Sequence, residues 1–257
     1  MGRKRPFLSW RPKMLRETCC VPIGNVVFVG TDDAHILRVD PDGARQCLTG
    51  FNAVASRDKW YAGSAIIDSK GIGPPLGIPS MAATCDGAVL LVNVHVGGVP
   101  RSTDSGLTWR PPIDINSDVH QVCAHPTRPD IVIAAAGLCI SRDAERHGLS
   151  KAGTSRPSLL CRCFWEERHF RISIRRPFCD ARRSLSTPDR QQRSLQPLRG
   201  GMPKRIDGIA DTNCIATRHS MAPVIDRSGC LYVSHDDGAT WSCPFDRLTV
   251  PSGLHIC

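Results

Sequence analysis

Two histidines occupy matching positions in short strand-like runs, and their side chains could bind a ligand. His120 lies in the run Val-His-Gln-Val-Cys123, and His255 lies in the run Leu-His-Ile-Cys257. Asp118 and Asp211 are near such runs in the sequence. Imidazole and carboxylate groups that converge can hold a metal ion or an anionic ligand. Alternatively, the histidines recur because each repeat has the same packing residue at the equivalent position. We treat these four residues as candidate ligand-binding groups and predict no resident metal or other cofactor.

Carboxylates are the second source of possible chemistry. Two carboxyl groups about 5–9 Å apart can hydrolyse a glycosidic bond, one as acid and the other as base or nucleophile. Turns also use Asp for local hydrogen bonding, so an Asp by itself does not mark a catalytic site. We therefore assign no catalytic residue among the available aspartates, which are Asp32, Asp33, Asp58, Asp118 and Asp211.

Two further groups carry side chains that bind ligands in other proteins. Trp60 and Tyr61 could form an aromatic ligand loop, and an exposed aromatic turn explains them equally well. Cys161, Cys163 and His169 are of the metal-binding type, but their spacing is not the Cys-x-x-Cys of zinc sites. They also lie in a segment whose sequence departs from the rest of the chain. We therefore exclude them as a metal site.

Short β-type runs separated by turns must position these groups, and their regular spacing favours an all-β repeat fold. An octet with the pattern Ser-x-Asp-x-Gly-x-x-Trp follows two of the runs, at 102–109 and 234–241. Its Asp can accept hydrogen bonds from amides just downstream, and its Gly supplies a positive φ. Its Trp buries a large apolar area. A third copy begins at Ser141 and Asp143 and loses the pattern from Glu145.

The octet resembles the Asp box, or bacterial neuraminidase repeat, of β-propellers in the WD40/YVTN/BNR-like superfamily. That superfamily includes sialidases and photosystem II assembly factors. The resemblance implies an all-β propeller whose boxes join the outer strands of a blade, on the face away from the ligand site. The box residues would then hold turns and take no part in binding or catalysis. They are Ser102, Asp104, Gly106, Trp109, Ser141, Asp143, Ser234, Asp236, Gly238 and Trp241.

Sialidase activity fits the sequence poorly. The run Phe-Arg171-Ile-Ser resembles the family's Phe-Arg-Ile-Pro motif, but it follows two boxes, whereas the family's motif precedes them. The family also needs a Tyr nucleophile paired with Glu, and this chain has only Tyr61 and Tyr232. Tyr232 leads directly into a box. We predict a non-enzymatic propeller that binds a protein, small-molecule or glycan ligand on its top face. The alternative is a glycoside hydrolase of the sialidase-like superfamily.

Cysteines indicate the period of the repeat. Cys123, Cys214 and Cys257 each end a short strand-like run. The step from Cys214 to Cys257 is 43 residues, close to the roughly 40–45 residues of a four-stranded blade. The step from Cys123 to Cys214 is 91 residues, about two periods. One further blade should therefore lie between them. Innermost strands of a propeller start at the mouth of its channel, which is where His120 and His255 would lie.

The β pattern is lost in residues 145–194, which are rich in Arg, Ser and Pro. Back-translation of residues 144–148 in a shifted frame restores Gly-Ala-Thr-Trp, the end of an octet, and other shifted readings restore β-like alternation. We interpret 145–194 as a blade translated out of frame, and a disordered basic insert is the alternative. The predicted organisation is a basic, disordered leader (1–18) and a single propeller domain (19–257), incomplete or with the scrambled blade at 145–194.

The net charge of +9 does not imply a nucleic-acid partner, because it is concentrated in one segment. Residues 145–194 contain 12 Lys or Arg and 5 Asp or Glu. No stretch of 18 apolar residues and no apolar run after the basic N-terminus are present, so we expect no membrane segment, no signal peptide and a cytoplasmic location. The 13 cysteines are expected as buried thiols, and the protein is expected as a monomer.

Overall fold

The structure is a computed structural model. It describes residues 16–55, 57–60, 77–94, 97–110, 119–135, 138–141, 143–144, 150–151, 158–165, 168–174, 183–188, 196–197, 200–203, 206, 213–249, 253–254 and 256. Regular structure in these residues is mostly β. The exceptions are the four-residue helix α1 (Thr49–Asn52) and one 3₁₀ turn (Arg57–Lys59).

The strands form five antiparallel sheets in chain order. The first sheet contains β1 (Glu17–Ile23), β2 (Val26–Thr31), β3 (Ile36–Val39) and β4 (Arg45–Cys47). The second contains β5 (Ser80–Ala83), β6 (Leu90–Asn93) and β7 (Arg101–Ser102). The third contains β8 (Val122–Ala124), β9 (Val132–Ala135), β10 (Leu138–Ser141) and β11 (Ser150–Lys151). The fourth contains β12 (Ser158–Trp165), β13 (Arg168–Ile174), β14 (Arg183–Pro188) and β15 (Gln196–Pro197). The fifth contains β16 (Ala222–Ile225), β17 (Leu231–Ser234) and β18 (Ser242–Phe245).

Isolated bridges complete the two sheets that have only three named strands. Arg110 pairs with Arg101 of β7 and adds an outer position to the second sheet. Ile215 pairs with Val224 of β16 and adds an inner position to the fifth sheet. With these bridges, each sheet is a meander with four strand positions, in which every strand pairs with the next one along the chain.

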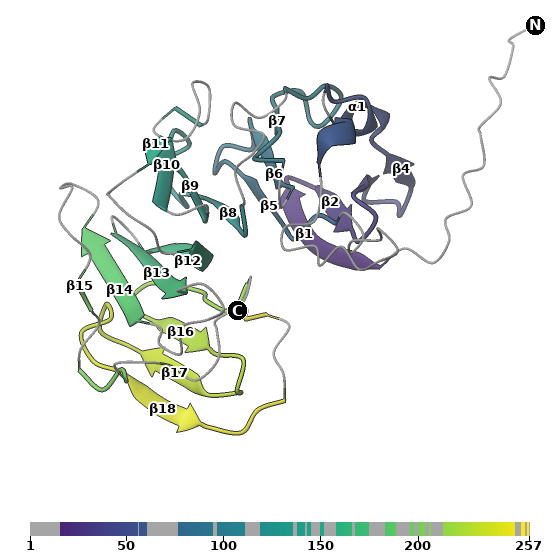
Figure 1. The fold of residues 1–257 in the computed structure, drawn as a ribbon. Helices are drawn as coiled ribbons and strands as arrows, with labels where there is room; N and C mark the ends of the chain where they lie inside the picture. Colours follow the sequence, from purple (N-terminus) through teal and green to yellow (C-terminus); the bar gives the residue numbers. More distant parts are fainter. Residues whose placement is uncertain are drawn as a thin grey trace, which may run out of the picture.

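The sheets contact one another mainly through their first strands. β1 lies against β5, β5 lies against β8, and β12 lies against β8 and β9. Figure 1 shows the five sheets following one another along an arc. The two complete octets follow the third strand position of the second and fifth sheets, at the end of the sheet opposite to the start of the inner strand.

Apolar side chains fill the spaces between sheets. All four residues of β6 are buried, because this strand has a sheet on each face. Leu90 and Val92 join Phe28 and Ile36 in a cluster with the first sheet. Leu91 belongs instead to a cluster with the third sheet. A separate cluster in the fifth sheet is built on residues that include Val224, Ile225, Tyr232 and Trp241.

The prediction of a largely β structure is confirmed, and two segments differ from the predicted organisation. β1 begins at Glu17, inside the range predicted as a leader, and residues 1–15 lie outside the described part of the chain. The range 145–194, expected to be irregular, contains β11 to β14. Strand assignments carry no information on coding DNA, so the reading-frame hypothesis stays a prediction. Among the described residues, no helix has the length and apolarity needed to cross a membrane.

Candidate functional site

The octet at 102–109 connects the two outermost strand positions of the second sheet, β7 and Arg110. The Ser102 hydroxyl donates to Asp104 Oδ1 at 2.8 Å and accepts from the Gly106 amide at 2.9 Å. Asp104 also accepts from the Thr108 amide at 2.9 Å and from the Thr108 hydroxyl at 2.5 Å. The Trp109 indole N–H donates to the Gly106 carbonyl at 2.9 Å. The polar groups of this octet are therefore engaged with one another.

The octet at 234–241 connects β17 and β18, again the outermost strands of a sheet, and it repeats these bonds. Ser234 donates to Asp236 at 2.9 Å and accepts from the Gly238 amide at 2.8 Å. Asp236 accepts from the Thr240 amide at 2.8 Å and from the Thr240 hydroxyl at 2.5 Å. Trp241 donates its indole N–H to the Gly238 carbonyl at 3.0 Å. The same eight-residue pattern thus folds in the same way in two sheets.

These hydrogen bonds favour the ionised form of the octet carboxylates. Partial burial raises the pKa of Asp104. The hydrogen bonds from Thr108 and Ser102 together lower it by a larger amount, so the pKa lies below its ordinary value. Bonds from Thr240 hold the pKa of Asp236 below its ordinary value as well. A general acid at neutral pH needs a raised pKa. The octet aspartates therefore behave as hydrogen-bond acceptors in turns.

The third, broken octet starts in the same way. Ser141 donates to Asp143 Oδ1 at 2.8 Å, as in the complete copies. Ala144 has φ +51°, close to the φ of +55° at Ser105 and +57° at Asp237, the equivalent positions. The complete octets continue with a Gly at positive φ, where this copy has Glu145, which lies outside the described residues.

Inner strands start close together at the opposite end of the sheets from the octets. The Thr18 hydroxyl of β1 donates to the Ile78 carbonyl, just before β5, at 2.5 Å. The Val122 amide of β8 donates to Ser80 Oγ of β5 at 3.0 Å. Gln121 Nε2 donates to Asn213 Oδ1 at 3.3 Å, which joins segments 92 residues apart. We call Thr18, Ser80, Gln121 and Asn213 the strand-start cluster.

The structure locates some of the predicted ligand residues relative to this cluster. His120 directly precedes Gln121 and is partly exposed. Leu254 donates its amide to the Asn213 carbonyl at 2.7 Å, which brings the segment before His255 to the cluster. Asp118, Asp211, His255 and Tyr61 themselves lie outside the described residues, so their predicted roles stay predictions.

Trp60 lies away from any open surface. It is 6% exposed and belongs to the apolar cluster between the first and second sheets. Its ring centroid is 5.5 Å from that of Phe51, and the Arg57 guanidinium lies 5.4 Å from the indole ring. The indole packs in the core and offers little surface to a ligand.

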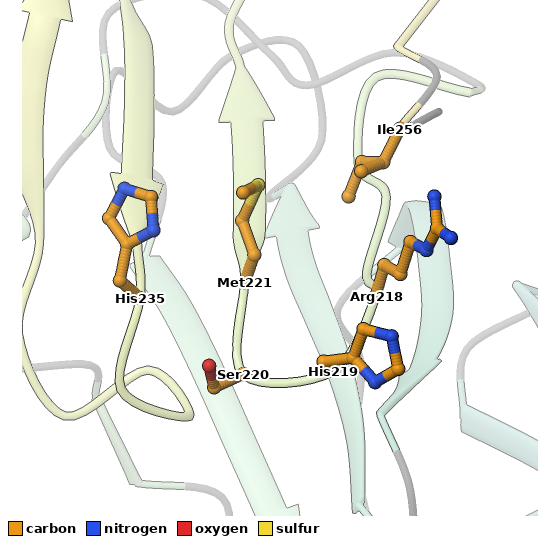
Figure 2. A pocket seen from close by; sticks show the side chains of 6 residues that line it. All are labelled: Arg218, His219, Ser220, Met221, His235 and Ile256. Atoms are coloured by element: carbon orange, nitrogen blue, oxygen red, sulfur yellow. The ribbon is translucent and has the colours of Figure 1, made fainter.

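A pocket that sequence reasoning missed lies in the fifth sheet, beside the octet at 234–241. It has a volume of about 340 Å³. Figure 2 shows Met221 between His235 and Arg218, Ile256 near Arg218, and His219 and Ser220 on the connecting loop. The lining therefore combines a guanidinium and two imidazoles with two apolar side chains. Nothing in the local sequence identifies it, because its residues come from three separate segments.

The chain matches no protein-family model, and no curated protein is similar to it in sequence. Several solved structures are similar to it. One is a GH74 xyloglucanase from Xanthomonas campestris (17% identity, 85% of this chain and 36% of that chain covered, TM-score 0.54). Another is YCF48 bound to D1 peptide (12% identity, 94% and 71% covered, TM-score 0.60). A third is the Cps50 (Swd1) β-propeller domain of Myceliophteria thermophila (12% identity, 84% and 64% covered, TM-score 0.56).

These structures support a β-propeller fold for the chain. The chain spans only 36% of the Xanthomonas xyloglucanase and 30% of the GH74 enzyme from Niastella koreensis. The similar structures include glycoside hydrolases as well as non-enzymatic propellers. Because one fold hosts unrelated functions, the likeness does not choose between them.

Proposed function

We propose that this chain is a non-enzymatic β-propeller that binds a segment of a partner protein on its top face, at the strand-start cluster. The observation that carries the proposal is the bond between Gln121 and Asn213, beside the partly exposed His120. Carboxamides and imidazoles donate and accept hydrogen bonds, as peptide groups do. His120 and Asn213 are both partly exposed, so a partner segment that crosses the inner strands would meet groups able to pair with its backbone, whereas the buried Gln121 would hold Asn213 in place.

Two similar structures support a protein partner. YCF48 was solved with a D1 peptide bound, and it is covered over 71% of its length. The Swd1 domain is a further non-enzymatic propeller. These likenesses support a protein as the kind of partner.

A glycoside hydrolase is the second candidate, favoured by the GH74 likenesses. One of its candidate carboxylates, Asp33, is poorly suited to the role of general acid. Burial raises the pKa of Asp33, but hydrogen bonds from Thr31 and His35 lower it below its ordinary value. Thr31 Oγ1 donates to Asp33 Oδ1 at 2.5 Å, within the turn after β2. This carboxylate is suited to holding its own turn, whereas a glycosidase acid needs a raised pKa.

The test selects peptides and compares two histidine variants. A phage library of random peptides is selected on the purified full chain, and the enriched peptides are synthesised with a fluorescent label. We expect His120→Ala to weaken the binding of these peptides, measured by anisotropy, by about tenfold. This is the loss expected when one hydrogen bond is removed. The control His235→Ala removes an exposed imidazole at the octet end, and it should leave unchanged the binding of those peptides that depend on His120.

Two results would contradict the proposal. If no peptide is enriched, or if every enriched peptide depends on His235 and not on His120, the strand-start cluster is not a peptide site. Release of reducing sugar from xyloglucan by the wild-type chain would favour the hydrolase instead.

A further inference from the structure

The pocket beside the octet at 234–241 is built by three neighbouring strand positions. Arg218 and Met221 form a bridge, with the amide of each bonded to the carbonyl of the other at 3.0 Å. Ala222 pairs with Ser234, so Met221 and His235 are neighbours one step further along the same two strands. Arg218, Met221 and His235 therefore form a row across the sheet. Ile256, from the C-terminal segment, closes the side near Arg218 (Figure 2).

The loop of this hairpin holds a histidine in an unfavourable backbone conformation. His219 and Ser220 form a two-residue loop, and His219 has φ +51°. Such a loop position favours Gly, because a Cβ is strained at positive φ. The Asp237 amide donates to the Ser220 carbonyl at 3.2 Å, which ties the loop to the octet. The chain thus keeps an imidazole in the pocket at a position where local structure favours no side chain.

The charge of the lining is one-sided. Arg218, His219 and His235 are all exposed, and no carboxylate is among the lining residues. In the described part of the chain, no ion pair involves the Arg218 guanidinium. The nearby Asp236 already accepts three hydrogen bonds, from Ser234 and Thr240. A cationic group with no internal counter-ion is available to an anion from outside.

We propose that this pocket binds a carboxylate, and that its ligand is an acidic segment of a protein. The carboxylate would meet the Arg218 guanidinium, which can bind it with two parallel hydrogen bonds, together with the imidazoles of His219 and His235. The methylene groups of a Glu side chain would lie against Met221 and Ile256. This site is at the octet end of the fifth sheet, so its failure would leave the proposal for the strand-start cluster untouched.

The test uses labelled peptides and the full chain. One peptide carries four Glu in an Ala and Gly background with an amidated C-terminus, and its partner carries four Gln. A third peptide has no acidic side chain and a free C-terminus, and it distinguishes a terminal carboxylate from a side-chain one. We expect the Glu peptide to bind about tenfold or more tightly than the Gln peptide in anisotropy titrations, as charge-assisted hydrogen bonds require.

Three variants assign this binding to the pocket. Arg218→Gln should weaken binding of the Glu peptide by about tenfold. Its control is Arg227→Gln, which removes the same charge from an exposed position in the turn between β16 and β17 of the same sheet. That control should bind within a factor of about two of wild type, because only long-range charge is lost. His219→Gly should weaken binding while the melting temperature stays equal or rises, because glycine relieves the positive φ.

The results of these titrations either support or overturn a carboxylate site in this pocket. Equal binding of the Glu and Gln peptides would overturn the proposal, as would equal losses from Arg218→Gln and Arg227→Gln. Binding of the peptide with the free C-terminus, lost in Arg218→Gln, would keep the carboxylate site but replace the acidic side chain by a chain terminus as its ligand. A loss of binding in His219→Gly with unchanged folding would support a direct role for the imidazole.

Discussion

Substitution of Ser102 by Ala tests whether the octet stabilises the fold through its internal hydrogen bonds. Ser102 is 2% exposed, and its hydroxyl accepts from the buried Gly106 amide at 2.9 Å. Ser102→Ala leaves this amide without its acceptor. An unsatisfied buried donor costs about 1–3 kcal/mol. The bond to Asp104 adds less, because water can replace it at a partly exposed carboxylate. We therefore expect the free energy of unfolding to fall by about 2 kcal/mol.

Urea unfolding measures this loss, followed by tryptophan fluorescence and by far-UV circular dichroism. The two signals must coincide for a two-state free energy to apply. The control is Thr103→Ala, which removes an exposed neighbouring hydroxyl and should change stability by less than about 0.5 kcal/mol. Equal midpoints for Ser102→Ala and Thr103→Ala would refute the reasoning, because they would show that the octet's internal bond makes no net contribution.

Two further predictions concern acid stability and close packing. The pKa of Asp104 is lowered in the folded chain, so its stabilisation is complete above the unfolded pKa of about 3.9 and is lost as pH falls through the folded pKa. The melting temperature should therefore fall below about pH 4, and less steeply in Asp104→Asn. Gly50→Ala should destabilise by about 1–3 kcal/mol despite a better helix propensity, because the new Cβ would overlap the Leu107 carbonyl oxygen. Its control is Gly77→Ala, where the nearest atom would be 3.4 Å away, and equal urea midpoints for the two variants would contradict the packing argument.

Local sequence was enough for features whose residues lie close together in the chain. Strand propensity and turn residues predicted a β structure, and the octet pattern located two turns that have matching hydrogen bonds. It was not enough for features that depend on contacts between distant segments. The pocket at Arg218 and His235 needs a strand pairing and a positive φ at His219, and the sequence gives no glycine or asparagine to indicate that φ. The cysteine period predicted one further blade in the range of the fourth sheet, but the Arg-, Ser- and Pro-rich composition of 145–194 did not indicate where its strands begin and end.

The two complete octets make the same close contact with a glycine, although the segment with the altered pattern separates them in sequence. In the second sheet, a Cβ at Gly50 would overlap the carbonyl of Leu107, the sixth octet residue. In the fifth sheet, a Cβ at Gly200 would overlap the carbonyl of Ala239, also the sixth octet residue. Both glycines follow the last strand of the preceding sheet by three residues, and in sequence both are preceded by Leu-x. The repeat is therefore defined by an interface between successive sheets as well as by the octet. Because Gly200 satisfies this interface, the repeat pattern has resumed by Gly200, after the segment 145–194.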